Sequence, residues 1–351
     1  MANRLEDLIK VALQKRGEFM SHRMSRLRAE SLLKSIESEK GKTNPHFSKL
    51  SLEYAQDVFG NKWFAPWLNV YAALSGQFKE GWIPENYYAA IVIPYIQGLY
   101  GNISNAKPLS KTLLKTSCLP DLAYFVNGLF FTSAWEVLVP DAVENYVFNN
   151  NKKIVYKQDN SNKGLGVYIF SKDMFDMDTI RKMGNGVFQR YIKQHRFFEE
   201  IMPGAVATLR ITSVIEDNGK ASCRGAYLRI GRKEDTHVRS GSAIKIPVDL
   251  KSGTLSEKGY MVNWQTTSCH PDTGILFEGK IIPKFDDCIA YVEKTHQQIP
   301  FCRLVGWDII VNDNEEVEQI EWNGSFNDII FSEATQGPCF SNMGWEKIWK
   351  R

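Results

Sequence analysis

The sequence of 351 residues predicts an α+β protein, with a helical N-terminal region followed by mixed and largely antiparallel sheets with helices. Two observations predict this class. Apolar residues recur at helical spacing near the start of the chain, and short β-type runs separated by turn signals begin after Lys111. A chain with 43% hydrophobic and 24% charged residues has a core large enough for two or three domains.

The first predicted helical segment covers residues 5–36, as one or two amphipathic helices. Residues 1–40 carry nine basic and six acidic side chains, which suits a solvated helix packed on the body or, as the alternative, a helix on a membrane surface. A second, aromatic-rich helical region covers residues 52–100. Gly60, Pro66, residues 81–84 and Pro94 interrupt it.

The β-type runs come next along the chain. The turn signal at residues 217–219 predicts a hairpin between two of them, and helical spacing returns at residues 286–298. The runs cover residues 153–156, 166–170, 186–191, 207–215, 221–230, 307–311 and 317–322. We expect a helical region with a candidate substrate-binding part at residues 1–108, a small central lobe at 109–190 and a C-terminal lobe at 191–351.

A hairpin over residues 307–322 brings oxygen-bearing side chains together. If its turn centres on Asn314 and Glu315, Asp308 faces Glu321, Trp307 faces Trp322 and Ile309 faces Ile320. Glu321 and Asn323 then project from one face, with Asp308 beside them. Two carboxylates and an amide oxygen are ligands suited to Mg²⁺, whereas the structural alternative is a solvated polar face.

A second feature is a strand that ends in Lys157 and is followed by a small glycine-containing loop, residues 158–166, and another strand. Such a loop lets backbone N–H groups approach phosphate oxygens while lysines supply positive charge. The loop is neither a P-loop nor a dinucleotide-binding fingerprint. Its structural alternative is an ordinary hairpin.

Taken together and in this order, these features resemble the ATP-grasp fold and, within it, the sugar-transfer-associated ATP-grasp family. The resemblance covers residues 80–335 and rests on Lys111, the Lys157 strand with its loop, 187–192 with His195, 208–211, 228–231, 270–274, 282–283, 306–308 and 321–323. It implies two α+β lobes that clamp ATP, preceded by the helical region.

The resemblance also implies roles for individual residues. Lys111 and Lys157 bind the ATP phosphates and the purine edge, and the loop with Asn162, Lys163, Gly164 and Gly166 forms the lid over the β- and γ-phosphates. The backbone of Gln189, Tyr191 and Ile192 meets adenine. Asp308, Glu321 and Asn323 hold magnesium.

Two arginines make physical sense without the resemblance. Arg210 and Arg229 lie in apolar β-type runs, where an isolated guanidinium needs an anionic partner. A phosphate or a substrate carboxylate would serve as a catalytic partner, and an ion pair with a nearby Glu is the structural alternative. His237 and His270 are candidates for taking a proton from an amine, or else structural histidines.

The sequence departs from the family pattern at several positions. Ser110 precedes Lys111 where the family usually has Asp, and Arg190 replaces an acidic residue in the hinge strand. The usual Asp-Asn and Gly-Gly pairs appear as Thr236-His237 and Gly241-Ser242. The lysine and metal positions are intact, so we expect nucleotide binding to be kept. Residues 233–246 are expected to shape the acceptor site, so the departures there bear on substrate choice.

We therefore expect an ADP-forming carboxylate–amine ligase that uses ATP and Mg²⁺ and forms an amide through an acyl phosphate. By family context its substrates are a nucleotide- or lipid-linked sugar acid and an amino acid, in cell-surface polysaccharide synthesis. The alternatives are a kinase that acts on a hydroxyl and a non-catalytic sugar-binding module. Amine-dependent ADP release distinguishes the ligase from the kinase.

Other classes of protein are disfavoured by composition. A net charge of +3 with dispersed Lys and Arg argues against nucleic-acid binding. Six cysteines without a C-x-x-C pair indicate reduced thiols rather than a disulfide framework or a zinc site. Because residues 1–10 lack a signal-peptide core and no apolar run is long enough to span a membrane, we expect a cytoplasmic protein.

Overall fold

The computed structural model describes residues 2–161, 165–204, 206–235 and 241–351, with residues 2–15 described without their side chains. The chain divides into two compact units. Unit 1 consists of Met1–Tyr95, Asn263–Gln265 and Asp328–Arg351, and unit 2 consists of Ile96–Val262 and Thr266–Asn327. The three-part division expected from the sequence stays a prediction.

Unit 1 is helical, as the sequence predicts. The segment expected as one or two helices is a single one, α1, and α2 ends at Gly60, whose φ of 75° lies in the left-handed region that favours glycine. The helices are α1 (Ala2–Lys40), α2 (Pro45–Phe59), α3 (Ala65–Ser75), α4 (Glu85–Tyr87) and α11 (Ile330–Gln336), with the shorter turns η1 (Lys62–Phe64), η2 (Tyr88–Val92) and η6 (Trp345–Lys350).

Aromatic side chains form the core of unit 1. Tyr87 is fully buried, and its ring centroid lies 4.5 Å from that of Phe59 and 5.1 Å from that of Phe64. Trp67, Tyr71 and Trp82 are also fully enclosed. Large rigid rings bury much apolar area for little lost rotamer freedom, which explains how short helices hold together here.

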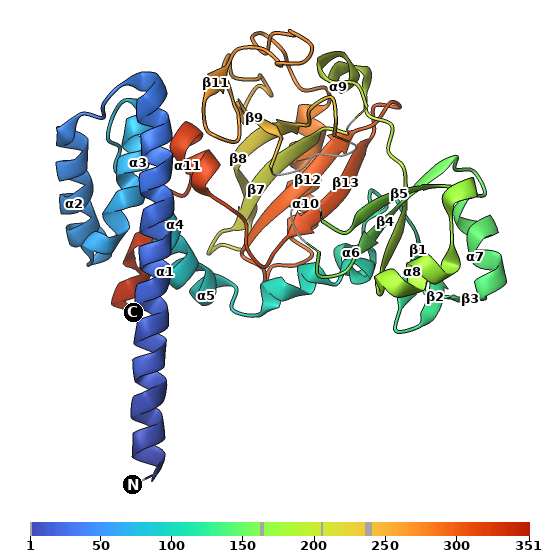
Figure 1. Cartoon of the computed structure of the whole chain (residues 1–351), viewed down its shortest axis with the longest axis horizontal. Helices are drawn as coiled ribbons and strands as arrows, with labels where there is room; N and C mark the ends of the chain where they lie inside the picture. Colours follow the sequence, from blue (N-terminus) through green and yellow to red (C-terminus); the bar gives the residue numbers. More distant parts are fainter. Residues whose placement is uncertain (1, 162–164, 205, 236–240) are drawn as a thin grey trace. The chain divides into compact units, whose positions relative to one another are not determined.

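Unit 2 contains two sheets, and each described strand pairing in them is antiparallel (Figure 1). The six-stranded sheet has the order β3-β2-β1-β6-β4-β5 and the seven-stranded sheet the order β11-β10-β9-β8-β7-β12-β13. The strands are β1 (Asp121–Val126), β2 (Leu129–Thr132), β3 (Val137–Leu138), β4 (Lys153–Gln158), β5 (Val167–Ser171), β6 (Gly186–Arg190), β7 (Thr208–Ile215), β8 (Ala221–Ile230), β9 (Ile244–Val248), β10 (Gly259–Tyr260), β11 (Thr266–Thr267), β12 (Leu304–Val311) and β13 (Val317–Asn323).

All seven runs predicted as strands are strands, and the hairpin expected at residues 217–219 joins β7 to β8. The sequence patterns did not reveal β1, β2 and β9, nor the two-residue strands β3, β10 and β11. The β1–β2 hairpin turns at Asn127 and Gly128, both with positive φ, and this dipeptide is the usual sequence signal of a two-residue hairpin turn.

Helices cover both sheets of unit 2. Val143 and Val147 of α7 and Ile180 of α8 share a buried cluster with Ile154 and Phe188 of the six-stranded sheet (Figure 1). Helix α10, predicted at 286–298, packs on β7 and β8. The remaining helices and turns are α5 (Ile93–Ile96), α6 (Ser110–Leu114), α7 (Pro140–Val147), α8 (Met177–Met183), α9 (Arg196–Ile201), α10 (Phe285–His296), η3 (Tyr100–Asn105), η4 (Lys107–Leu109) and η5 (Lys172–Met174).

The sequence also led to expectations about membrane-spanning segments and about the cysteines. Within the described ranges, no helix combines the length and the apolar character needed to cross a membrane. The six cysteines are free thiols, and burial raises the pKa of both Cys288 and Cys302 to about 12. Protonated thiols are poor nucleophiles and poor metal ligands, in agreement with the structural role expected for them.

Candidate functional site

The predicted hairpin is β12–β13, and its register places Asp308 opposite Glu321 and Trp307 opposite Trp322, as expected. One expectation was wrong: Ile309 pairs with Gln319 rather than Ile320, because a β-bulge interrupts the ladder after Asp308. The extra residue of a bulge has no cross-strand partner. Ile320 is that residue.

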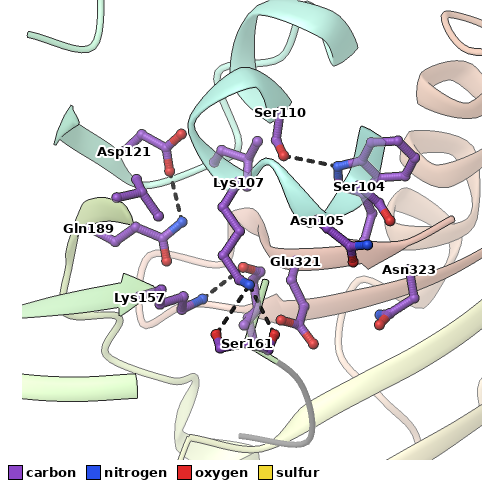
Figure 2. Close-up of a pocket in the computed structure, with 14 residues that line it drawn as sticks. Ser104, Asn105, Lys107, Ser110, Asp121, Lys157, Ser161, Gln189, Glu321 and Asn323 are labelled. Atoms are coloured by element: carbon purple, nitrogen blue, oxygen red, sulfur yellow. Dashed lines mark hydrogen bonds between the residues drawn. The ribbon is translucent and has the colours of Figure 1, made fainter. Parts of the chain in front are cut away.

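A cavity of about 40 Å³ lies in unit 2 where the two sheets meet segment 104–110 (Figure 2). Its lining includes the predicted residues Lys157, Gln189, Glu321 and Asn323. The volume suits a water molecule or an ion, so a nucleotide needs the lining to move apart. The lining residues are Ser104, Asn105, Lys107, Ser110, Leu119, Asp121, Lys157, Ser161, Val187, Gln189, Ile320, Glu321, Trp322 and Asn323.

Lys157 of β4 is buried, and its Nζ donates to the carbonyl of Ile320 at 2.8 Å. The bulge on β13 thus holds the lysine of the other sheet. Burial lowers the pKa of Lys157, while the carboxyls of Glu321 and Asp121 act in the opposite direction. A lysine fixed in this way presents a cation inside the pocket.

A second lysine in the pocket, Lys107, was missed by sequence analysis. Its Nζ donates to the carbonyl and the hydroxyl oxygen of Ser161, at 3.1 and 3.3 Å. Figure 2 shows Lys107 and Lys157 reaching toward the part of the pocket where Glu321 lies. Burial lowers the pKa of Lys107, and Glu321 opposes that effect. The sequence signal that could have located Lys107 is Pro108, which follows it directly and fixes the first turn of η4.

Lys111 does not line this pocket. It lies on α6, and its Nζ donates to the backbone carbonyl of Asp121 at 3.3 Å. Asp121 itself lines the pocket and was not predicted. Its Oδ1 accepts from Gln189 at 2.7 Å, and burial raises its pKa. Gln189 is therefore positioned by its side chain, on the strand predicted to meet adenine.

The other residues predicted for nucleotide binding lie elsewhere. Ile192 is buried in the core of the seven-stranded sheet, and the Tyr191 hydroxyl donates to the carbonyl of Gly204 at 3.3 Å. Gly166 closes the β4–β5 hairpin with a φ of 75°, and a Cβ there would clash with Ser161. Asn162, Lys163 and Gly164 lie outside the described residues, as do Thr236 and His237.

The two arginines meet the predicted metal ligand Asp308. Arg210 binds both carboxylate oxygens, with its Nε at 2.6 Å and its Nη2 at 2.9 Å, and Arg229 lies 3.7 Å from Oδ2. The structural alternative expected a Glu as the partner, and the structure has Asp308 in that place. The third nitrogen of Arg210 donates to Asn327, a residue that sequence analysis missed, at 3.0 Å. A side chain at position 306 would clash with Asn327, so this position requires glycine.

The side-chain oxygens of Asp308, Glu321 and Asn323 are chemically suited to Mg²⁺. A carboxylate offers about four lone-pair directions, so Asp308 keeps capacity beyond the two used by Arg210. Glu321 lies beside it, and burial together with the charge of Asp308 raises the pKa of Glu321. A divalent cation would relieve this crowding of carboxyls. The Nδ2 of Asn323 donates to Gly306, which leaves its oxygen as the donor atom for a metal.

No cluster of three or more His, Cys, Asp or Glu side chains suited to a metal occurs among the described residues. The predicted set differs from such a cluster because its third member is the amide of Asn323. Of these three residues, Glu321 and Asn323 line the cavity, whereas Asp308 does not line it and is bound by Arg210. The assignment of the three residues to a metal stays a prediction.

Three departures from the family pattern have local explanations. The Ser110 hydroxyl accepts from the indole of Trp322 at 3.0 Å, and Arg190 pairs with Glu318 at 3.0 Å. Ser242 donates to Asp235. His270 is fully buried, with Nε2 at 2.9 Å from the carbonyl of Gly231 and Nδ1 accepting from a backbone N–H, which favours its structural reading.

Comparison with known proteins completes this description. Residues 174–343 match the family model described as sugar-transfer associated ATP-grasp. This part of the chain, slightly under half of it, is similar in sequence to that family. The match confirms the family resemblance over residues 174–335, a range that includes Arg210, Arg229 and the β12–β13 hairpin, and it does not cover Lys111 or Lys157. No curated protein matches the chain in sequence.

Solved structures similar to this chain include several ligases and a carboxylase. An ADP complex of N5-carboxyaminoimidazole ribonucleotide synthetase is 9% identical, over 62% of this chain and 44% of that one, with a TM-score of 0.38. The biotin carboxylase domain of Hydrogenobacter thermophilus 2-oxoglutarate carboxylase, solved with MgADP and bicarbonate, is 12% identical over 70% and 44%, with a TM-score of 0.42.

The D-alanine–D-alanine ligase of Coxiella burnetii is 10% identical, over 71% of this chain and 52% of that one, with a TM-score of 0.36. The chain thus spans about half the length of the structures it resembles.

Proposed function

We propose that this protein is an ATP-dependent, ADP-forming carboxylate–amine ligase. The observation that carries the proposal is the meeting of Lys107, Lys157 and Glu321 in one pocket of a chain with the ATP-grasp family match. Two ammonium groups beside a carboxyl suit a phosphate chain accompanied by a divalent cation.

The lysines would bind the phosphates of ATP. In the described state Lys107 is held by Ser161 and Lys157 by the carbonyl of Ile320. Phosphate oxygens are charged acceptors and make stronger hydrogen bonds than these neutral oxygens. Nucleotide binding therefore exchanges the Lys107–Ser161 bonds for phosphate contacts and opens the pocket on that side.

Asp308, Glu321 and Asn323 would hold magnesium. When bound, the ion neutralises charge on the phosphates during transfer. The chain's own contribution is to keep the ligands in place, since Arg210 grips Asp308 with two hydrogen bonds and Arg229 stands beside it. The same guanidinium groups supply positive potential to the anionic acceptor.

The reaction would proceed in two transfers. An oxygen of the acceptor carboxylate attacks the γ-phosphorus, and the bond from this phosphorus to the β–γ bridging oxygen breaks. ADP departs, and the acceptor is now an acyl phosphate. An amine then attacks the acyl carbon, phosphate departs and the nitrogen loses a proton, which gives an amide. The narrow cavity between the sheets limits the access of water to the acyl phosphate.

The family description is the support for a proposed class of acceptor. We propose a sugar acid as the carboxylate and an amino acid as the amine, in the synthesis of a cell-surface polysaccharide.

Oxygen-18 in the acceptor carboxylate tests this reaction. Acyl-phosphate chemistry moves one labelled oxygen into the released phosphate, which mass spectrometry detects. The control is Asp308→Asn, which removes charge from the site and should stop ADP release. Labelled amide with unlabelled phosphate would contradict the route, and a stable phosphorylated product without amine would indicate a kinase instead.

A further inference from the structure

Unit 1 contains a second pocket, between α1, α2 and the η1–α3 segment, which the proposed ligase chemistry does not use. Its volume is about 730 Å³, within the ~300–1,000 Å³ range of small-molecule sites. All of its lining residues belong to unit 1. The pocket is therefore independent of the Lys157 site.

The buried small residues of the lining form the floor of this pocket. Ala29 of α1, Ser51 of α2 and Ala65 of α3 are at most 4% exposed and line it. Larger side chains at these positions would have closed it.

The floor contains an unpartnered polar group. The Ser51 side chain is 1% exposed, lines the pocket, and its Oγ has no hydrogen-bond partner among the described residues. A buried hydroxyl without a partner costs about 1–3 kcal/mol. A ligand that carries a hydroxyl or carbonyl group at this depth would satisfy it.

One wall of the pocket is aromatic. The ring centroid of Trp63 lies 6.3 Å from that of Phe19 and 4.9 Å from that of His22. Phe19 is 53% and Trp63 46% exposed, so these rings offer apolar area that the chain itself does not cover. Burial lowers the pKa of His22, which favours its neutral form and an apolar wall.

The rim carries positive charge. Arg23, Arg26 and Lys62 line the opening, against a single acidic residue, Glu30, which is paired with Arg26 at 2.7 Å. None of the described acidic side chains forms an ion pair with Arg23 or Lys62. An anion at the rim would find two cations not already engaged in such a pair.

We propose that this pocket binds a small anionic amphiphile, with its carboxylate or phosphate head between Arg23 and Lys62, its apolar body against Trp63 and Phe19, and a polar group near its tail bonded to Ser51. Charge complementarity at the rim, apolar area on the wall and one hydroxyl on the floor together specify this class of ligand.

Calorimetric titration of the full chain with 12-hydroxydodecanoate tests the proposal, because this compound has an anionic head, an apolar chain and a terminal hydroxyl. The neutral analogue 1,12-dodecanediol should bind about tenfold more weakly and dodecanoate several-fold more weakly, since each lacks one hydrogen-bonded or charged group. Acetate, which lacks the apolar body, should not bind.

Variants assign the binding to the pocket. Ser51→Leu fills the floor and Arg23→Glu with Lys62→Glu reverses the rim, and each should weaken binding of 12-hydroxydodecanoate at least about tenfold. Lys34→Glu, an exposed charge on α1 that does not line the pocket, is the matched control and should leave binding unchanged. Lys157→Met should also bind normally, which separates this pocket from the proposed ligase site.

Three results would overturn the proposal. The first is equal affinity for 12-hydroxydodecanoate and the diol, and the second is binding that survives both Ser51→Leu and the rim reversal. The third is binding to phosphatidylglycerol vesicles alone that persists in Ser51→Leu, which would assign the basic face of α1 to a membrane surface. Circular dichroism confirms that each variant is folded.

Discussion

The two units bury carboxyl groups in opposite ways. In unit 1, Glu333 is fully buried and receives backbone N–H groups from Ile83 and Cys339, and its pKa rises to about 7. In unit 2, Asp308 is equally enclosed but receives the Arg210 guanidinium, and its pKa falls well below the usual range. Burial alone neutralises an acid, whereas burial beside a cation keeps it charged.

This difference separates a structural acid from an acid that can do chemistry. Glu333 ties α11 to residue 83 and to residue 339, and burial raises its pKa although the backbone N–H groups that it accepts from act in the opposite direction. Asp308 stays ionised beside a pocket that contains two lysines. The contrast between a buried acid with a cationic partner and one without can be tested by pH dependence and by substitution.

The stability of unit 1 should fall as the pH rises from about 4.5 to 7. Over that interval the folded state keeps the Glu333 proton that the unfolded state has lost, which is worth about 3 kcal/mol. Hydrogen exchange in α11, corrected for intrinsic rates, measures the change. The Glu333→Gln variant should be less stable than the native protein at each pH, because the amide nitrogen of Gln cannot accept a hydrogen bond from a backbone N–H. Its stability should not change with pH over this interval.

Unit 2 should respond in the opposite direction because of His296. Its pKa is lowered by burial to about 4, so between pH 6.5 and 4 the unfolded state binds a proton that the folded state does not. Stability in β7 and β12 should therefore fall by up to about 3 kcal/mol as the pH falls through this range. A parallel response of both units, or the same slope in His296→Gln, would contradict the contrast.

The neutral form of His296 also follows from its partners. The Trp307 indole donates to Ser213 at 2.7 Å, so the Ser213 hydroxyl can donate to Nδ1 of His296, whose Nε2 then donates to the carbonyl of Cys302. Trp307, Ser213 and His296 thus each donate one hydrogen bond to the next group in this series. A second proton on His296 would reverse one of the bonds.

Lys157→Met should weaken Mg·ATP binding about 100-fold, because a buried cation that is already held toward the pocket is lost. Equilibrium binding of a fluorescent ATP analogue measures this change. Lys153→Met, an exposed lysine on the same strand, is the matched control and should have no effect. Equal loss in both variants would show that a general fall in positive potential, rather than the buried lysine, matters.

The smallest effect distinguishes the two lysines of segment 107–111. Lys107→Ala should weaken Mg·ATP binding about tenfold, and Lys111→Ala no more than about twofold, since only Lys107 lines the pocket. The same binding assay compares them. The reverse order would restore the role first expected for Lys111 and contradict the role given to Lys107.

Local patterns predicted much of unit 2. Alternation and turn signals gave the β7–β8 hairpin, and the spacing of the polar tip gave the Asp308–Glu321 register. These features depend on residues close together in the sequence, where strand periodicity and turn chemistry decide the outcome.

Long-range partners could not be predicted in this way. Arg210 meets Asp308 across 98 positions, and Lys107 meets Ser161 across 54, so packing rather than spacing selects them. Asn327 takes part in the arginine site through the space left by Gly306, which no local pattern reveals. The β-bulge depends likewise on the contacts around β13.

That bulge has a further consequence. A hairpin without Ile320 would form an unbroken ladder, yet it would lack the carbonyl that anchors Lys157. The irregular strand is thus the better binding strand. Engineering this hairpin for regularity, a common route to thermostability, would be expected to trade away nucleotide affinity.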